Sequence, residues 1–307
     1  SQFYEFLKEK KFIIPEKSIG NYPISHFSIA SSLNMKYLND LSNSVGKDSK
    51  SYLPVREMLH NNPVMKNFKS LGYDIVITAS LLSSTENFVL VDDIICDTKK
   101  MDSILLDTVT RASMIGYFVE RYDEQEKRDK VNCAFSEIKT IGNNNDKPIF
   151  AFIHILLPHS PFIFGPNGES VTPGIPISSE TWDEKIAYID QLKFANKEIT
   201  KVIEKILDKN EKSIIILQSD HGSAFDVDWK NPNKSMMSQR LSILNAYYTP
   251  EISEEQFYEN ITPVNSFRII FNEYFSGNYK ILEDRNYWSH GSAPWDFHDV
   301  TETVGKK

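Results

Sequence analysis

The chain has 307 residues, of which 40% are hydrophobic and 25% charged, and its formal net charge is −8. This composition is typical of a globular protein with a sizeable core, and the negative charge without a basic, aromatic-interleaved cluster argues against a nucleic-acid partner. No apolar run approaches the roughly 20 residues of a membrane span, so we expect membrane contact only through segments absent from this chain. Cys96 and Cys133 lack the Cys-x-x-Cys spacing of a zinc site and leave the redox compartment open.

In chain order, apolar runs of strand length alternate with helical patterns. Residues 1–12 predict an amphipathic helix. The predicted strands are residues 74–78, 149–157, 213–217 and 242–248, and the predicted helices are residues 54–71, 101–120 and 182–207. This alternation predicts an α/β fold, a three-layer α/β/α sandwich around a mostly parallel sheet, as a single domain over residues 1–307.

The first candidate catalytic residue is Ser25, in the segment that begins at Asn21. Pro23 biases Tyr22 away from helix, and the small residues after Ser25 predict a helix start. A serine alkoxide or a phosphate at that position would be stabilised by backbone N–H groups and the helix dipole. By residue preference alone, however, Ser25 is more simply a helix N-cap.

The second candidate is His159, which follows the strand predicted at residues 149–157. Pro158 and Pro161 flank the His-Ser pair and favour an extended turn that fixes the imidazole over the strand end. An imidazole there can donate to an anionic oxygen or give a proton to a leaving group.

The third candidate is the adjacent pair Asp220 and His221, directly after the apolar run that ends at Leu217. The short β-branched run is typical of a central parallel strand, and ligands bind at the carboxyl ends of such strands. A carboxylate oxygen and an imidazole nitrogen are ligands for one divalent cation, while Gly222 lets the chain turn away. The simpler alternative is a capped strand end without a metal.

Taken in order, these segments resemble the alkaline phosphatase/sulfatase superfamily. The closer resemblance is to its sulfatase-like hydrolase/transferase group, which includes phosphoethanolamine and phosphoglycerol transferases and lipoteichoic acid synthase. The segments that carry the resemblance are residues 21–25 with 30–35, 157–162, 188–196, 218–222, Arg240 with 244–248, and 263–268. The resemblance implies an alkaline-phosphatase-like fold.

The resemblance also implies roles for single residues. Ser25 occupies the position of the nucleophilic hydroxyl, commonly threonine, which contacts the metal and forms a covalent phospho- or sulfo-enzyme. Asp220 and His221 match a metal-ligand pair, and His159 matches a histidine that meets the anionic head of the substrate. His290 is a candidate second-metal or substrate histidine. Mixed oxygen and nitrogen donors suit Zn or Mn equally.

The sequence departs from this group at two points. Members begin with a strand that ends in an acidic metal ligand, whereas residues 1–12 resemble the helix after it, so we expect the first strand to be missing and a gap beside the strand at residues 213–217. The formylglycine signature Cys/Ser-x-Pro-x-Arg is also absent, because Cys96 and Cys133 have other neighbours. This absence disfavours aryl-sulfatase activity of the formylglycine type.

The predicted function is metal-dependent transfer or hydrolysis of a phosphate ester on a lipid or glycan, with Ser25 as nucleophile. The resemblance places this activity on the extracytoplasmic face of the cell membrane. The alternatives are a sulfate ester hydrolase, or a non-catalytic binding module that kept the fold and lost the metal site.

Overall fold

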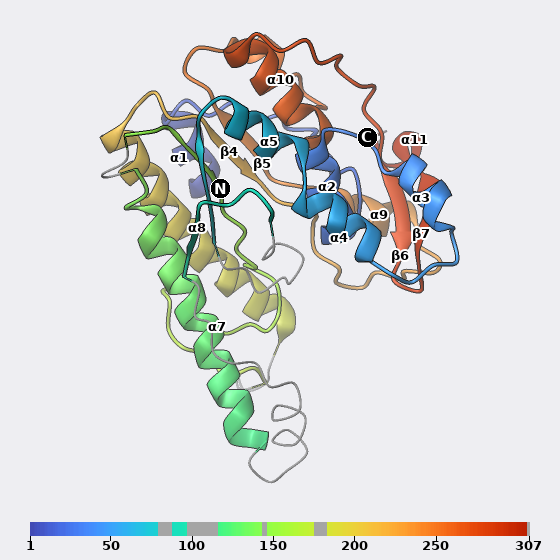
Figure 1. Cartoon of the computed structure of the whole chain (residues 1–307). Helices are drawn as coiled ribbons and strands as arrows, with labels where there is room; N and C mark the ends of the chain where they lie inside the picture. The colour runs from blue at the N-terminus through green and yellow to red at the C-terminus, as the bar shows by residue number, and fades with distance from the viewer. Residues whose placement is uncertain (79–87, 97–115, 143–145, 175–182, 306–307) are drawn as a thin grey trace. The chain divides into compact units, whose positions relative to one another are not determined.

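A computed structural model describes residues 1–78, 88–96, 116–142, 146–174 and 183–305 (Figure 1). The chain divides into two compact units. Unit 1 comprises Ser1–Leu71, Phe88–Leu90 and Asn210–Lys307, and unit 2 comprises Gly72–Asn87 and Val91–Lys209. The expectation of one domain that lacks its first strand stays a prediction.

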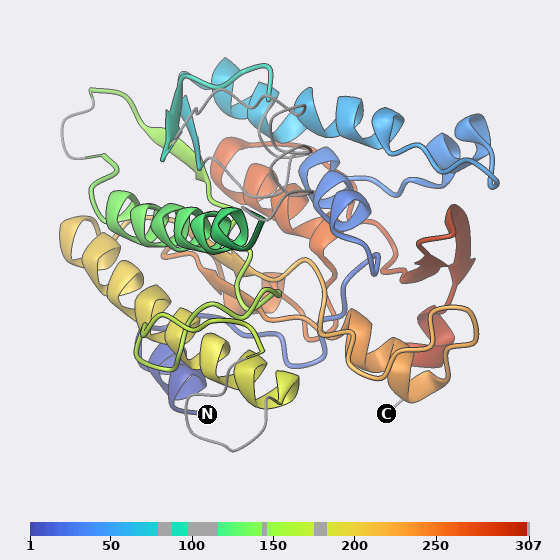
Figure 2. The same ribbon diagram turned by 90° about the horizontal axis from the view of Figure 1, so that it is seen from below.

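Unit 2 contains the parallel sheet that the sequence predicts. Its strands are β1 (Asp74–Thr78), β2 (Asp93–Ile95) and β3 (Ile149–Phe152), in the order β2-β1-β3. Ile75 and Ile77 of the central strand are fully buried. The unit's long helices are α7 (Gly116–Ile138) and α8 (Glu184–Lys209), which lie side by side (Figures 1 and 2). The α/β class is therefore confirmed. Most of the helix predicted at residues 101–120 lies outside the described residues.

Aromatic and aliphatic side chains join the two helices of unit 2. Phe135 of α7 packs against Phe194 of α8, which in turn stacks on Phe164 with 4.4 Å between ring centroids. A disulfide between Cys96, after β2, and Cys133 of α7 spans 37 residues of sequence. A covalent loop of that length removes about 3–4 kcal/mol of chain entropy from the unfolded state. The sequence left this pairing undecided.

Unit 1 contains most of the shorter elements. They are α1 (Gln2–Glu9), α2 (Ser25–Asn34), α3 (Asn39–Val45), α4 (Leu53–His60), α5 (Pro63–Ser70), β4 (Ile215–Gln218), α9 (Lys234–Leu241), β5 (Asn245–Tyr248), η2 (Glu254–Gln256), α10 (Pro263–Phe275), β6 (Tyr287–His290), β7 (Ala293–Asp299) and α11 (Thr301–Val304). Strands β6 and β7 form an antiparallel hairpin.

Strand β4 corrects one expectation. Its apolar run predicted a central parallel strand, but β4 pairs antiparallel with β5, with Leu217 opposite Ala246. The side chains of β4 are only half-buried. A short apolar run predicts that a strand forms but not whether the neighbouring strand runs parallel or antiparallel to it. That direction depends on the connection between β4 and β5, which runs through α9. Among the described residues, no strand pairs with the other edge of β4.

The single helix predicted at residues 54–71 is also wrong, because the structure has two helices there. Asn62 caps the second helix by accepting a hydrogen bond from the Met65 amide at 2.9 Å, and Pro63 takes the first helical position. Proline at that position needs no N–H donor and cannot continue the preceding helix. The Asn-Pro step therefore ends α4 and starts α5.

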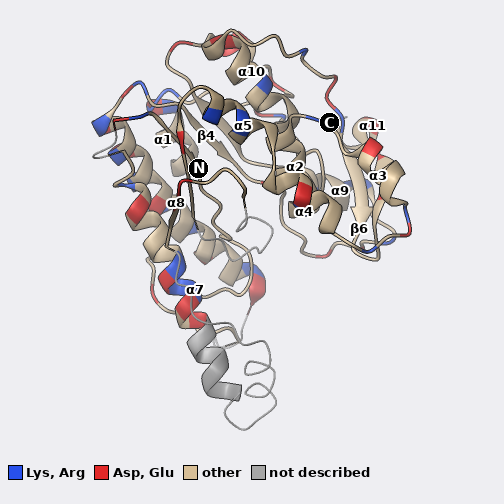
Figure 3. Cartoon of the chain, in the orientation of Figure 1, with Lys and Arg blue, Asp and Glu red and all other residues tan. Residues whose placement is uncertain are grey.

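Charged residues of both signs are intermingled along α7 and α8 (Figure 3). Lys139, directly after α7, and Glu198 of α8 lie 3.3 Å apart, and pairs within one helix include Lys130 with Glu126. Such surface pairs contribute little stability individually. In the part of the chain that the structure describes, no helix is long and apolar enough to cross a membrane.

Candidate functional site

Helix α2 places Ser25 at its first helical position. The preceding Ile24 is extended, with φ −118° and ψ 128°, and supplies no side-chain cap. The hydroxyl of Ser25 lies 2.9 Å from Nε2 of His221. Ser25 is therefore not an N-cap, and its hydroxyl meets an imidazole from a distant part of unit 1.

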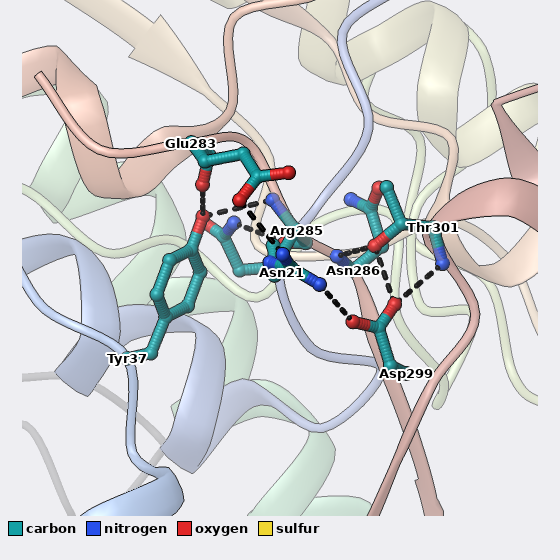
Figure 4. Close-up of polar contacts among 7 residues, drawn as sticks. All are labelled: Asn21, Tyr37, Glu283, Arg285, Asn286, Asp299 and Thr301. Atoms are coloured by element: carbon teal, nitrogen blue, oxygen red, sulfur yellow. Dashed lines mark hydrogen bonds and ion pairs between the residues drawn. The ribbon is translucent and has the colours of Figure 1, made fainter.

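Buried hydrogen bonds fix the segment before Ser25. Asn21 is fully buried, and its Oδ1 accepts from the Val264 amide at 2.9 Å while its Nδ2 donates to the Arg285 carbonyl at 2.8 Å. Arg285 in turn donates to Glu283 and Asp299 (Figure 4). The segment that leads to the helix is thereby attached to the chain around β6 and β7.

The turn after β4 positions the Asp-His pair. The Ser219 amide donates to the Leu244 carbonyl at 2.9 Å, which extends the contact with the chain before β5. A Cβ atom at Gly222 would lie 2.2 Å from the Gln239 carbonyl oxygen, so only glycine fits there. Ser28, one turn along α2 from Ser25, donates to the Asp220 carbonyl at 2.7 Å. Helix α2 and the turn are thus joined directly.

The hydrogen bonds of His221 determine what its ring offers. Nδ1 lies 3.0 Å from the Gly222 carbonyl oxygen, which can only accept, so Nδ1 carries a proton. In the neutral ring Nε2 then presents a lone pair. Around Nε2 lie the hydroxyl of Ser25 at 2.9 Å and Oδ2 of Asp220 at 3.3 Å. The side chains of His221 and Asp220 are 11% and 22% exposed, so the site is partly shielded from water and still accessible.

This donor set fits a divalent cation. Ligand atoms about 2.0–2.2 Å from a tetrahedral metal lie about 3.3–3.6 Å from each other, and the 3.3 Å between Nε2 of His221 and Oδ2 of Asp220 falls in that range. Oxygen and nitrogen donors suit either zinc or manganese. Among the described residues, no group of three or more His, Cys, Asp and Glu side chains is placed to bind a metal. A cation here would take Ser25 as a third protein ligand.

The other two predicted residues are His159 and His290. His159 belongs to unit 2, where it is exposed, its amide donates to the Leu156 carbonyl at 3.0 Å, and its own carbonyl accepts from Gln191. Its approach to Ser25 stays a prediction. His290 ends β6, and its Nδ1 lies 2.7 Å from the hydroxyl of Ser292. No contact of His290 within the described part of the chain is with Ser25, Asp220 or His221.

Two residues that contact the site had no role assigned from the sequence. Ser28 lies three residues after Ser25, on the same face of α2, and this spacing was an available signal. Arg240 donates to the carbonyls of Pro23 and Gly222, which flank the site. These partners are 217 and 18 residues away in sequence, so no local pattern indicates them.

Comparison with known families matches residues 27–269 to the Sulfatase family. The chain belongs to this family, and its resemblance to the alkaline phosphatase/sulfatase superfamily is confirmed. A comparison with curated proteins finds no match.

Solved structures share the fold at low sequence identity. The C-terminal periplasmic domain of EcEptC from Escherichia coli, in complex with Zn, has a TM-score of 0.60 and 13% identity over 100% of this chain and 89% of that one. The C-terminal periplasmic domain of phosphoethanolamine transferase EptC from Campylobacter jejuni has a TM-score of 0.53 and 12% identity, over 92% and 84%. A putative sulfatase from Bacteroides thetaiotaomicron has a TM-score of 0.56 and 12% identity, over 92% and 71%.

Proposed function

We propose that this protein is a metal-dependent enzyme that transfers or hydrolyses a phosphate ester through Ser25. The observation that carries the proposal is the convergence of the Ser25 hydroxyl and Asp220 Oδ2 on Nε2 of His221. A serine hydroxyl is a weak nucleophile until a neighbouring group lowers its pKa. A divalent cation bound to Ser25, Asp220 and His221 would supply that effect and neutralise charge on the phosphate.

The protein's own residues have separate tasks in this reaction. The hydroxyl of Ser25 gives up its proton to solvent and its oxygen forms a bond to phosphorus as the bond to the leaving alcohol oxygen breaks, and that oxygen takes up a proton. Water or an acceptor hydroxyl then attacks the phosphoserine and releases Ser25. Asp220 and His221 would hold the cation, and His159 would bind the anionic head group of the substrate or protonate the leaving oxygen.

A metal-free serine–histidine–aspartate relay fits the geometry less well. In such a relay the carboxylate bonds to Nδ1, and the serine faces Nε2. Here Nδ1 of His221 faces the Gly222 carbonyl, and Asp220 lies on the same side of the ring as Ser25. A carboxylate and a bare ring nitrogen side by side repel each other, and a shared cation removes that repulsion.

The substrate class and location are further parts of the proposal. The absence of the formylglycine signature favours phosphate over sulfate esters. Two related structures are described as periplasmic domains, and the disulfide between Cys96 and Cys133 fits an oxidising compartment. These observations support an extracytoplasmic enzyme that acts on a phosphate ester, and we propose a lipid or a glycan as the molecule that carries the ester.

Three serine variants test the nucleophile. Turnover of bis(4-nitrophenyl) phosphate is measured with added Mn²⁺ or Zn²⁺, and we expect Ser25→Ala to lower kcat by at least about 10³-fold. Ser25→Thr keeps the hydroxyl and should keep activity. Ser44→Ala, which removes an exposed helical serine bonded to the Asp40 carbonyl, is the control and should not change the rate.

Two results would redirect the proposal. Full activity of the Ser25→Ala protein would exclude a covalent step at this residue. A wild-type protein that neither binds metal nor turns over the phosphodiester would favour the non-catalytic binding module, and faster turnover of 4-nitrophenyl sulfate would favour the sulfate ester hydrolase.

A further inference from the structure

We propose that Arg240 is a positioning residue that sets the distance between Ser25 and His221. This inference rests on the proposed function, because it concerns the same two residues. It assigns the task to a side chain on α9, an element that supplies none of the candidate reacting groups.

The guanidinium of Arg240 joins the two segments that carry the site. Its Nε donates to the Pro23 carbonyl at 2.8 Å, two residues before Ser25. Its Nη1 donates to the Gly222 carbonyl at 2.7 Å, one residue after His221. Because a guanidinium is planar and its donors have a fixed spacing, the two carbonyls are kept at a fixed separation.

The second of these bonds also concerns the imidazole ring. The Gly222 carbonyl oxygen accepts from Arg240 and from Nδ1 of His221 at 3.0 Å. That oxygen is the acceptor that keeps the proton on Nδ1 and the lone pair of Nε2 directed at Ser25. A group that orients the remote nitrogen of a metal-binding histidine affects metal affinity by about 10–100-fold.

The guanidinium is itself fixed on one face by aromatic rings. Its Cζ lies 5.2 Å from the ring centroid of Trp229, and Trp229 stacks on Trp288 with 5.4 Å between centroids. Trp288 is buried in β6. Stacking on an aromatic face restricts the rotation of an arginine head, so the direction of its two N–H donors is set before any ligand binds.

A second arginine in unit 1 provides a matched control. Arg268 on α10 donates to the carbonyl of Met35, which ends α2 in the left-handed conformation, and to the Lys280 carbonyl at 2.7 Å. Both of these acceptors are backbone carbonyls. Arg240 and Arg268 therefore make the same kind of contact near opposite ends of α2, and only Arg240 bonds to the residue next to His221.

The experiment compares wild type, Arg240→Gln, Arg240→Lys and Arg268→Gln. For each protein we measure the ring ¹⁵N signals of His221 without metal, the dissociation constant for Mn²⁺ alone, kcat and KM for the phosphodiester, and the melting temperature. Arg240→Gln should shift the His221 signals, raise the Mn²⁺ dissociation constant about 10–100-fold, and lower kcat more than it raises KM. Arg240→Lys should recover part of each effect. Arg268→Gln should lower the melting temperature and leave His221 and Mn²⁺ binding unchanged.

The outcomes separate this inference from the proposed function. If Arg240→Gln lowers only the melting temperature, as Arg268→Gln does, Arg240 is structural and the inference is wrong. If Arg240→Gln does not fold, Arg240→Lys decides, and unchanged His221 signals with unchanged Mn²⁺ binding would overturn the inference. If the His221 signals shift as expected but the wild-type protein has no turnover, the positioning role stands and the proposed function fails.

Discussion

The two units of this protein both have an apolar core, but they differ in how many polar side chains they bury. Among the described residues, buried polar side chains are concentrated in unit 1, while those of unit 2 are Thr78, Arg128 and Gln191. Unit 2 relies on its apolar helix pair and the disulfide between Cys96 and Cys133. Apolar contacts are non-directional, whereas hydrogen bonds fix the positions of atoms. The unit that contains Ser25, Asp220 and His221 is the one with more buried polar side chains to make such directional bonds.

The polar side chains of unit 1 form a connected network beneath the site. Gln218, the last residue of β4, donates to Oδ1 of Asn245 at 2.9 Å and to the Ser266 hydroxyl at 3.3 Å. The Tyr247 hydroxyl lies 2.6 Å from the same serine oxygen. Burial raises the pKa of Tyr247 far above its ordinary value, so this phenol stays neutral. The network attaches the strand before Asp220 to α10.

The largest effect among these substitutions should come from Asp220→Asn, which changes the site in unit 1. Removal of the carboxylate charge weakens the proposed cation ligand, and we expect Mn²⁺ affinity to fall by about 100-fold or more, with turnover lost as well. Isothermal titration measures the affinity. Asp228→Asn, in the turn where the Asp228 carboxylate accepts from the Lys230 amide, is the control and should bind Mn²⁺ as wild type does. Equal affinity in the Asp220→Asn protein would remove Asp220 from the site.

Removal of the disulfide should destabilise unit 2. The double substitution Cys96→Ser and Cys133→Ser restores the entropy of a 37-residue loop to the unfolded chain, a loss of about 3–4 kcal/mol. Amide exchange should accelerate in β1 and remain slow in β5, because the disulfide lies within unit 2 alone. Equal acceleration in both strands would show that the two units unfold together.

A substitution in the polar network should destabilise unit 1 and leave unit 2 unchanged. Gln218→Leu leaves the oxygens of Asn245 and Ser266 without the donor that they have now, and loss of such buried bonds costs about 1–3 kcal/mol each. Exchange should accelerate in β5 and not in β1. An unchanged β5 would mean that the network contributes no net stability.

The smallest expected effect is at Glu198 in unit 2. Partial burial raises its pKa, but hydrogen bonds from Lys201 and Lys139 outweigh burial and lower the pKa below its ordinary value of 4.5. A depressed carboxyl pKa gives stability that is present above 4.5 and lost as the pH falls through the folded-state value. Glu198→Gln should cost less than about 1 kcal/mol at pH 7. Denaturant unfolding should show this difference shrink below pH 4.5, and a constant difference would contradict it.

The sequence predicted the local parts of this structure well. Strand β1 has the bounds that its apolar run indicated, and Asp220 and His221 follow a strand as expected. The helix predicted at residues 54–71 rested on its apolar spacing alone, although Pro63 within it is a signal for a helix break. The antiparallel partner of β4, the disulfide and the contacts of Arg240 were not predictable in this way. Each joins residues far apart in the chain, and periodicity carries no information on such pairs.

The most direct test of the central claim is anomalous diffraction from crystals soaked in Mn²⁺. We expect one strong peak about 2.0–2.3 Å from Oδ2 of Asp220 and Nε2 of His221, within bonding reach of the Ser25 hydroxyl. This result would establish the shared cation that we propose from the separations of 2.9 Å and 3.3 Å around Nε2. A peak bound elsewhere, or none at a Mn²⁺ concentration that saturates binding in solution, would contradict the account.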